Sequence, residues 1–80
     1  MRPVFIMVKC NLGKSYEVAA CALEEIGQVS EIYSISGQYD LLIKAYLEND
    51  EDTGRFINDK IHLLPDVRDT FTLITFKAFS

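Results

Sequence analysis

The spacing of hydrophobic residues along the chain alternates between two periods, and the changes predict six secondary-structure elements. Period-two patterns and short apolar runs without turn residues predict four strands, at residues 3–10, 28–36, 41–46 and 67–79. Hydrophobic residues three and four apart predict two helices between them, at 15–26 and 56–64. The resulting order is strand, helix, strand, strand, helix, strand. This order predicts an α+β domain with the ferredoxin-like βαββαβ fold.

Each predicted helix has a start signal and an end signal. Ser15 is expected to cap the first helix, and Gly27 is expected to end it in the left-handed conformation. The acidic run 48–52 precedes the second helix, where carboxylates satisfy free backbone amides, and Pro65 and Asp66 are expected to end that helix. The expected buried stripes are Val18, Ala19, Ala22, Leu23 and Ile26 in the first helix, and Phe56, Ile57, Ile61 and Leu64 in the second.

The segment from Ile35 to Tyr46 is the most informative part of the chain. Gly37 and Gln38 match the Gly-X loop of a two-residue hairpin, since glycine adopts a positive φ at little cost. The following run is apolar on both faces, which predicts a strand inside the sheet. Asp40 stands at the entrance to this strand, where its carboxylate can meet backbone N–H groups or the amine of a ligand.

The predicted topology leaves one face of the sheet without a cover. Right-handed crossovers place the first and third strands in the centre of a four-stranded antiparallel sheet, with both helices on one face. The other face then exposes apolar side chains from all four strands. An open apolar face of this kind favours association with a second copy, so we expect a homodimer that pairs through the sheets.

Composition limits the classes of partner and the cellular compartment. Eighty residues form a single domain, 1–80, and 49% of them are hydrophobic, which is rich for so short a chain. A net charge of −4 and a pI near 4.7 argue against direct binding of nucleic acid or of an anionic membrane. The sequence contains no secretory signal pattern, so Cys10 and Cys21 are expected to be reduced thiols of a cytoplasmic protein.

Residues suited to catalysis are few. His62 is the only histidine, and its place near the end of the second helix fits a favourable interaction with the helix dipole. No nucleophile elbow, phosphate loop or spaced set of metal ligands is present, so no metal or cofactor is expected. We therefore expect a protein that is not an enzyme, although a site shared across a dimer stays open as an alternative.

A small polar set remains on this apolar chain and suits an amino-acid ligand. Thr70 and Thr72 lie two apart on the last strand, so both point to one face. Hydroxyls and backbone amides suit a carboxylate, while Asp40 suits an amine. A structural interpretation competes with this one: Asp40 then only caps the turn, and threonine is simply common in strands. The candidate ligand-binding residues are Gly37, Gln38, Tyr39, Asp40, Thr70 and Thr72.

Two motifs give the chain a family resemblance. One is the Gly-x-Tyr-Asp-Leu-Leu turn at 37–42, and the other is Leu-Pro-x-Val-x-x-Thr-x-Thr at 64–72. With Val29 and the Phe-Ile-x-Asp-Lys-Ile segment at 56–61, they fall in register with all six predicted elements. The chain thus resembles the effector-binding domain of Lrp/AsnC-type transcription regulators, the RAM module for regulation of amino-acid metabolism.

The resemblance implies a function that composition and spacing do not. RAM modules are ferredoxin-like, dimerise through their sheets as dimeric α/β barrels, and assemble into octamers or similar rings. Small effectors, usually amino acids, bind between dimers. The resemblance implies that the turn at 37–40 and the strand carrying Thr70 and Thr72 line that pocket, with Asp40 on the amine and the threonines on the carboxylate.

The chain departs from the regulators in one respect. Those proteins carry an N-terminal helix-turn-helix domain, whereas Met1 here leads directly into the first predicted strand. We therefore expect a stand-alone module that senses an amino acid, binds no DNA itself, and acts alone or with full-length Lrp/AsnC-type regulators. Two alternatives stay open: a structural oligomerisation adaptor without a ligand, and an enzyme of the dimeric α+β barrel type.

Overall fold

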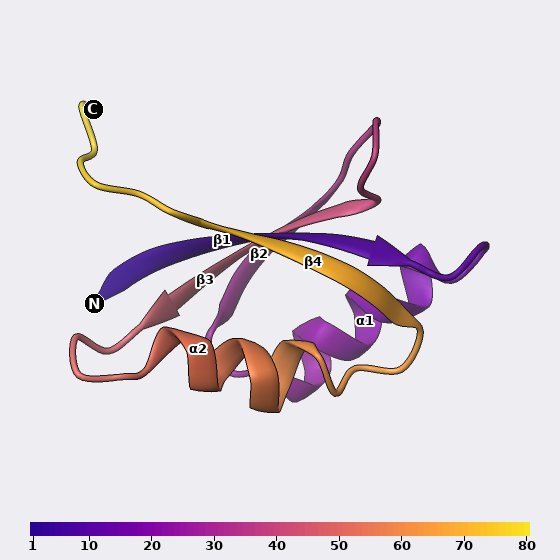
Figure 1. Cartoon of the computed structure of the whole chain (residues 1–80), viewed down its shortest axis with the longest axis horizontal. Coiled ribbons are helices and arrows are strands. Elements are labelled where there is room, and N and C mark those ends of the chain that lie inside the picture. Colours follow the sequence, from indigo (N-terminus) through magenta and orange to yellow (C-terminus); the bar gives the residue numbers. More distant parts are fainter.

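The computed structural model describes all 80 residues and has the predicted order of elements (Figure 1). The second helical segment has two parts, because the short helix α2 continues directly into the π-helical turns of η1. The elements are β1 (Arg2–Cys10), α1 (Ser15–Glu25), β2 (Val29–Ser34), β3 (Leu41–Leu47), α2 (Thr53–Phe56), η1 (Ile57–Ile61) and β4 (Val67–Ile74).

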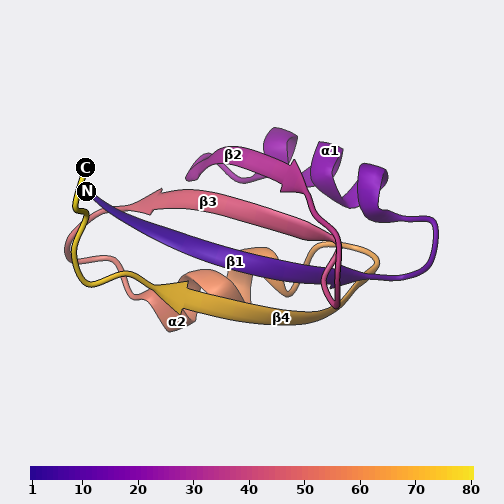
Figure 2. The ribbon, with the colours of Figure 1, turned by 90° about the horizontal axis from the view of Figure 1, so that it is seen from above.

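The four strands form one antiparallel sheet in the order β2-β3-β1-β4. Both helical segments lie on the same face of this sheet, below the strands in Figure 1, and Figure 2 shows the four strands from above. The first and third strands are therefore central, and β2 and β4 are the edges. The predicted ferredoxin-like fold is confirmed.

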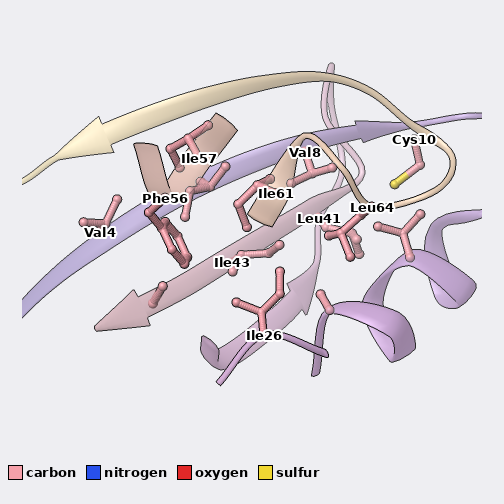
Figure 3. Close-up of a cluster of buried hydrophobic side chains, with 14 of the residues drawn as sticks. Val4, Val8, Cys10, Ile26, Leu41, Ile43, Phe56, Ile57, Ile61 and Leu64 are labelled. Atoms are coloured by element: carbon pink, nitrogen blue, oxygen red, sulfur yellow. The ribbon is translucent and has the colours of Figure 1, made fainter. Parts of the chain in front are cut away.

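The core lies between the central strands and the helices (Figure 3). Alternate side chains of β1 and β3 are buried, and facing pairs such as Ile6 and Ile43 share the helix side of the sheet. Full burial of each such side chain contributes roughly 1.5–3 kcal/mol. The helical segments supply Val18, Ala22, Ile26, Phe56, Ile57, Ile61 and Leu64, all buried.

The acidic run before α2 caps the helix, as expected. A carboxylate oxygen of Asp52 accepts a hydrogen bond from the backbone N–H of Arg55 at 3.0 Å. The carboxylate of Glu51 accepts from the backbone N–H of Glu48 at 3.0 Å and from the amide of Gln28 at 2.8 Å. The hydrogen bond from Glu48 contributes most, and with the bond from Gln28 it holds the pKa of Glu51 below its usual value. The acidic residues therefore organise the loop that leads into the helix.

The predicted bounds of the first helix are correct to within one residue, but both predicted capping residues are wrong. Lys14 holds the N-cap position without a side-chain hydrogen bond, and Ser15 is already helical. The reason is the preceding turn, in which Gly13 has a φ of +77° and the N–H of Lys14 donates to the carbonyl of Asn11. At the other end Ile26 is extended, so the helix ends without a left-handed Gly27.

The stripe on the first helix is narrower than predicted. Val18, Ala22 and Ile26 are buried at four-residue spacing, and Ala19 is half-buried beside them. Leu23 is 57% exposed, because it follows the buried Ala22 and is therefore rotated by about 100° from the side of the helix that faces the sheet. Leu23 was wrongly assigned to the core.

The predicted two-residue hairpin is also wrong. Strand β2 ends at Ser34 and β3 begins at Leu41, so residues 35–40 form the connection, with an N–H···O bond from Ile35 to Asp40 at its base. Gly37 does have a positive φ, of +105°. The loop is wider because Asp40 bonds to β1, as the site geometry below shows.

Both edge strands differ from their predicted lengths and patterns. A register shift between Val29 and Glu31 places both Val29 and Ile32 against the core, where strict alternation had put them on opposite faces. Strand β4 ends at Ile74, which pairs with Val4, because little of β1 remains beyond that pair. Residues 75–80 lie outside the sheet.

The core assignment predicts unequal effects of two substitutions near the end of η1. Ile61 is fully buried, whereas Leu63 is 75% exposed. Ile61→Ala should lower the free energy of unfolding by about 2–5 kcal/mol, since it removes transfer free energy and leaves a cavity. Leu63→Ala should change it by about 0.5 kcal/mol or less. Urea denaturation at one fixed protein concentration measures both, and equal losses would contradict the assignment.

Candidate functional site

Asp40 anchors the loop between β2 and β3 to the end of β1. Its carboxylate accepts a hydrogen bond from the backbone N–H of Cys10 at 2.8 Å and lies 4.0 Å from the ammonium of Lys9. Its own N–H donates to the carbonyl of Val8 at 2.9 Å. The bond to Cys10 uses one carboxylate oxygen, so the half-buried side chain keeps capacity to accept from a ligand.

The rest of this loop lies over the open face of the sheet. Figure 1 shows the loop rising on the side away from the helices, and Figure 2 shows it reaching across β1 toward β4. The ring of Tyr39 lies 6.4 Å from the ring of Phe71, centre to centre. Phe71 pairs with Met7, whose side chain is also on the open face. Gly37 and Gln38 are exposed.

Thr70 and Thr72 lie on the opposite face of the sheet. They pair with Val8 and Ile6, whose side chains are buried on the helix side, so the two threonines share that side. Both are half-buried. The hydroxyl of Thr70 is 2.8 Å from Nε2 of His62. The prediction that the two threonines share a face therefore holds in the structure.

Within one protomer the six predicted residues form two groups, not one pocket. Asp40 and Thr70 approach the same residue of β1, Val8, from its two neighbouring strands. Tyr39 contacts the open face, whereas the threonines face the helices. A single small ligand that touches all six residues thus requires surfaces from more than one copy of the chain.

A hollow of about 320 Å³ lies at the edge strand beside Thr70. It is lined by His62, Val67, Arg68, Asp69 and Thr70, so one of the six predicted residues borders it. Sequence reasoning missed His62, because an interaction with the helix dipole explained its position. The contact depends on the turn at 62–66, where Asp66 has a φ of +69°, and no sequence pattern gives that geometry.

The two cysteines are free, and Cys10 belongs to the core. Burial raises the pKa of the Cys10 thiol above its usual value, and the nearby carboxylates of Asp40 and Asp66 raise it further. The ammonium of Lys9 acts in the opposite direction. Cys10 is therefore a packing residue and not an activated nucleophile.

The structure contains no group of three or more His, Cys, Asp or Glu side chains placed to hold a metal ion. None of its helices combines the length and the apolar character needed to cross a membrane.

Comparison with known proteins decides the family. A model of the Lrp/AsnC ligand binding domain matches residues 3–80, nearly the whole chain. The chain belongs to the Lrp/AsnC ligand-binding domain family. The resemblance inferred from the two sequence motifs is thereby confirmed, and this Lrp/AsnC domain has the fold that the resemblance implied.

Three relatives place the Lrp/AsnC domain more closely. It is 37% identical over 74 residues to the HTH-type transcriptional regulator FL11 of Pyrococcus horikoshii, covering 92% of this chain but 48% of that regulator. The crystal structure of FFRP-DM1 is 33% identical, has a TM-score of 0.85, and is covered over its whole length. Regulator NMB0573 of Neisseria meningitidis, solved as a complex with L-Met, shares the fold, with a TM-score of 0.83, 20% identity and coverage of 99% of this chain and 52% of that one.

The charges around Cys10 predict two opposite changes in its titration. Asp40→Asn removes a negative charge and should lower the pKa of the thiol, whereas Lys9→Gln removes a positive charge and should raise it. The 13Cβ chemical shift of Cys10, followed by NMR between pH 7 and 11, measures both. If the thiol pKa changed in the same direction in both variants, these charges would not face the thiol.

Proposed function

We propose that this Lrp/AsnC domain is a cytoplasmic sensor of an amino acid or a similar small effector, which it binds between copies of itself. It pairs through the open face of its sheet, assembles further into a ring, and modulates Lrp/AsnC-type transcription regulation. It does not contact DNA itself. The observation that carries this proposal is the family match over residues 3–80, which is to a ligand-binding domain.

The divided site supports binding between copies. The carboxylate of Asp40 and the hydroxyls of Thr70 and Thr72 flank β1 from two sides and do not converge in one protomer. A second copy that brings its loop 37–40 to the strand β4 of the first would complete a set with both an amine acceptor and carboxylate donors. An α-amino acid requires this combination. NMB0573, related by fold alone, supports the view that this fold can hold one.

The open sheet face supports pairing. Tyr33, Phe71 and Leu73 are between 41% and 52% exposed there. Phe5, Met7, Leu42 and Tyr46 are half-buried on the same face and have no helix over them. The ammonium of Lys44 lies over the rings of Phe5 and Tyr46, at 5.8 Å and 5.2 Å. The apolar surface around it costs free energy in water, and pairing with a copy would remove that cost.

Pairing would also allow the effector to control the oligomeric state. A ligand shared between copies stabilises the assembled form by its differential affinity for the two states. Effector binding would then change how full-length Lrp/AsnC-type regulators that assemble with this domain regulate transcription.

Two other functions fit the same fold. A structural adaptor would oligomerise without a ligand, and its assembly would ignore metabolites. An enzyme of the dimeric α+β barrel type would use a cavity between sheets. His62, the only histidine, is exposed and hydrogen-bonded to Thr70, and the matching family is one of ligand binding, so the sensor is the better supported of the three.

A thermal-shift screen tests the sensor proposal. The purified domain is heated with each of the twenty proteinogenic amino acids at millimolar concentration. A ligand present at a hundred times its Kd adds about 2.7 kcal/mol to the stability of the folded state. In a domain of this size the melting temperature then rises by about 10 °C or more. We expect such a rise with one or a few amino acids, and a flat response to all twenty would favour the adaptor.

The same screen tests Asp40 as the amine contact. Asp40→Ala should abolish most of the rise caused by the effector, since the ammonium loses its acceptor. Asp50→Ala is the matched control, because Asp50 is an exposed carboxylate in the loop before α2. Each variant is compared with its own melting temperature without ligand, which separates lost binding from lost stability. Undiminished stabilisation of Asp40→Ala would remove Asp40 from the site.

A further inference from the structure

The hollow at the start of β4, beside Val67 to Thr70, lies at an irregularity in the strand. Val67 pairs with Cys10 and Thr70 pairs with Val8, and both partners are buried on the helix side. Val67 and Thr70 thus share a face although they are three residues apart, which regular alternation forbids. The register shift opposite Lys9 and Cys10 allows this by leaving one residue, Arg68, without a partner in β1. Bulges of this type commonly re-aim side chains beside binding sites.

The polar groups around this hollow are largely unused by the fold. The guanidinium of Arg68 is exposed and makes no ion pair or hydrogen bond within the chain. His62 makes one side-chain contact, the 2.8 Å hydrogen bond between its Nε2 and the hydroxyl of Thr70. Asp69 pairs with Lys9 on the other face of the sheet, and one of its carboxylate oxygens accepts from the backbone N–H of Thr70 at 2.9 Å.

These groups match the carboxylate end of an α-amino acid. A guanidinium binds a carboxylate through two parallel hydrogen bonds. Because the hydroxyl of Thr70 and Nε2 of His62 share one hydrogen bond, a neutral imidazole leaves one further donor for the carboxylate, either the hydroxyl or Nδ1–H. The volume of about 320 Å³ gives room for the charged end of a small ligand, and Val67 supplies an apolar wall.

We propose that Arg68 and His62, together with Thr70, bind the carboxylate of the effector. This inference rests on the proposed sensing function. It adds two carboxylate contacts that the sequence motifs do not contain, and it gives the lone histidine a role in recognition. Asp40 stays available for the amine, from a neighbouring copy.

Calorimetric titration of the full chain with each amino acid found in the thermal screen tests the carboxylate contact. Arg68→Gln should lower the affinity for the free amino acid at least tenfold. It should change the affinity for the methyl ester of that amino acid less than twofold, because the ester has no carboxylate charge. Arg55→Gln is the control, since it removes another exposed guanidinium, which pairs with Asp59 at 3.8 Å on α2 and η1. His62→Gln should act in the same direction as Arg68→Gln.

Melting temperatures without ligand confirm that each variant folds. If His62→Gln does not fold, Arg68→Gln decides, because Arg68 makes no contact on which the fold depends.

The possible results separate this inference from the function on which it rests. If the parent binds none of the twenty amino acids, the sensing function fails and the assignment of Arg68 and His62 fails with it. If the parent binds one but Arg68→Gln binds it as tightly as Arg55→Gln does, only the assignment is overturned. Equal weakening of the amino acid and its ester by Arg68→Gln would also overturn it, since the guanidinium would then not act on the carboxylate.

Discussion

The structure depends on a sheet that can bury only one of its two faces within the chain. Four strands in the order β2-β3-β1-β4 have two helical segments on one side, and those segments together bury the apolar residues of the central strands. On the other side lie the loop at 35–40, which places Tyr39 beside Phe71, and part of the C-terminal segment, which borders a hollow with Phe5 and Tyr46. The open face keeps Phe71 and Leu73 in water, and this imbalance is the physical reason for expecting a second copy.

The same constraint shapes the candidate site. Because β1 is central, the loop after β2 and the edge strand β4 reach it from opposite sides, and each places its polar groups on a different face of the sheet. The fold therefore divides acceptor and donor groups between two surfaces. The proposed assembly would bring them together and would link effector binding to oligomeric state.

Elements that hydrophobic burial determines could be predicted from the sequence, whereas features that depend on contacts between residues distant in the sequence could not. The alternation in β1 and β3 and the stripe of Phe56, Ile57, Ile61 and Leu64 gave the fold, because hydrophobic burial decides them. The hairpin length was wrong because the bonds of Asp40 to β1 widen the loop, and no local pattern contains those bonds. His62 and Thr70 meet across a turn whose geometry depends on the positive φ of Asp66.

Sedimentation velocity of the purified chain between about 1 and 100 µM tests the central claim most directly. The account predicts a dimer or a larger assembly for the parent, and a shift toward monomer for Phe71→Arg, which places a charge on the open face. Tyr16→Arg, an equally drastic change at an exposed aromatic residue of α1, should sediment like the parent. A parent that is monomeric at every concentration would contradict the account, as would an unchanged assembly of Phe71→Arg.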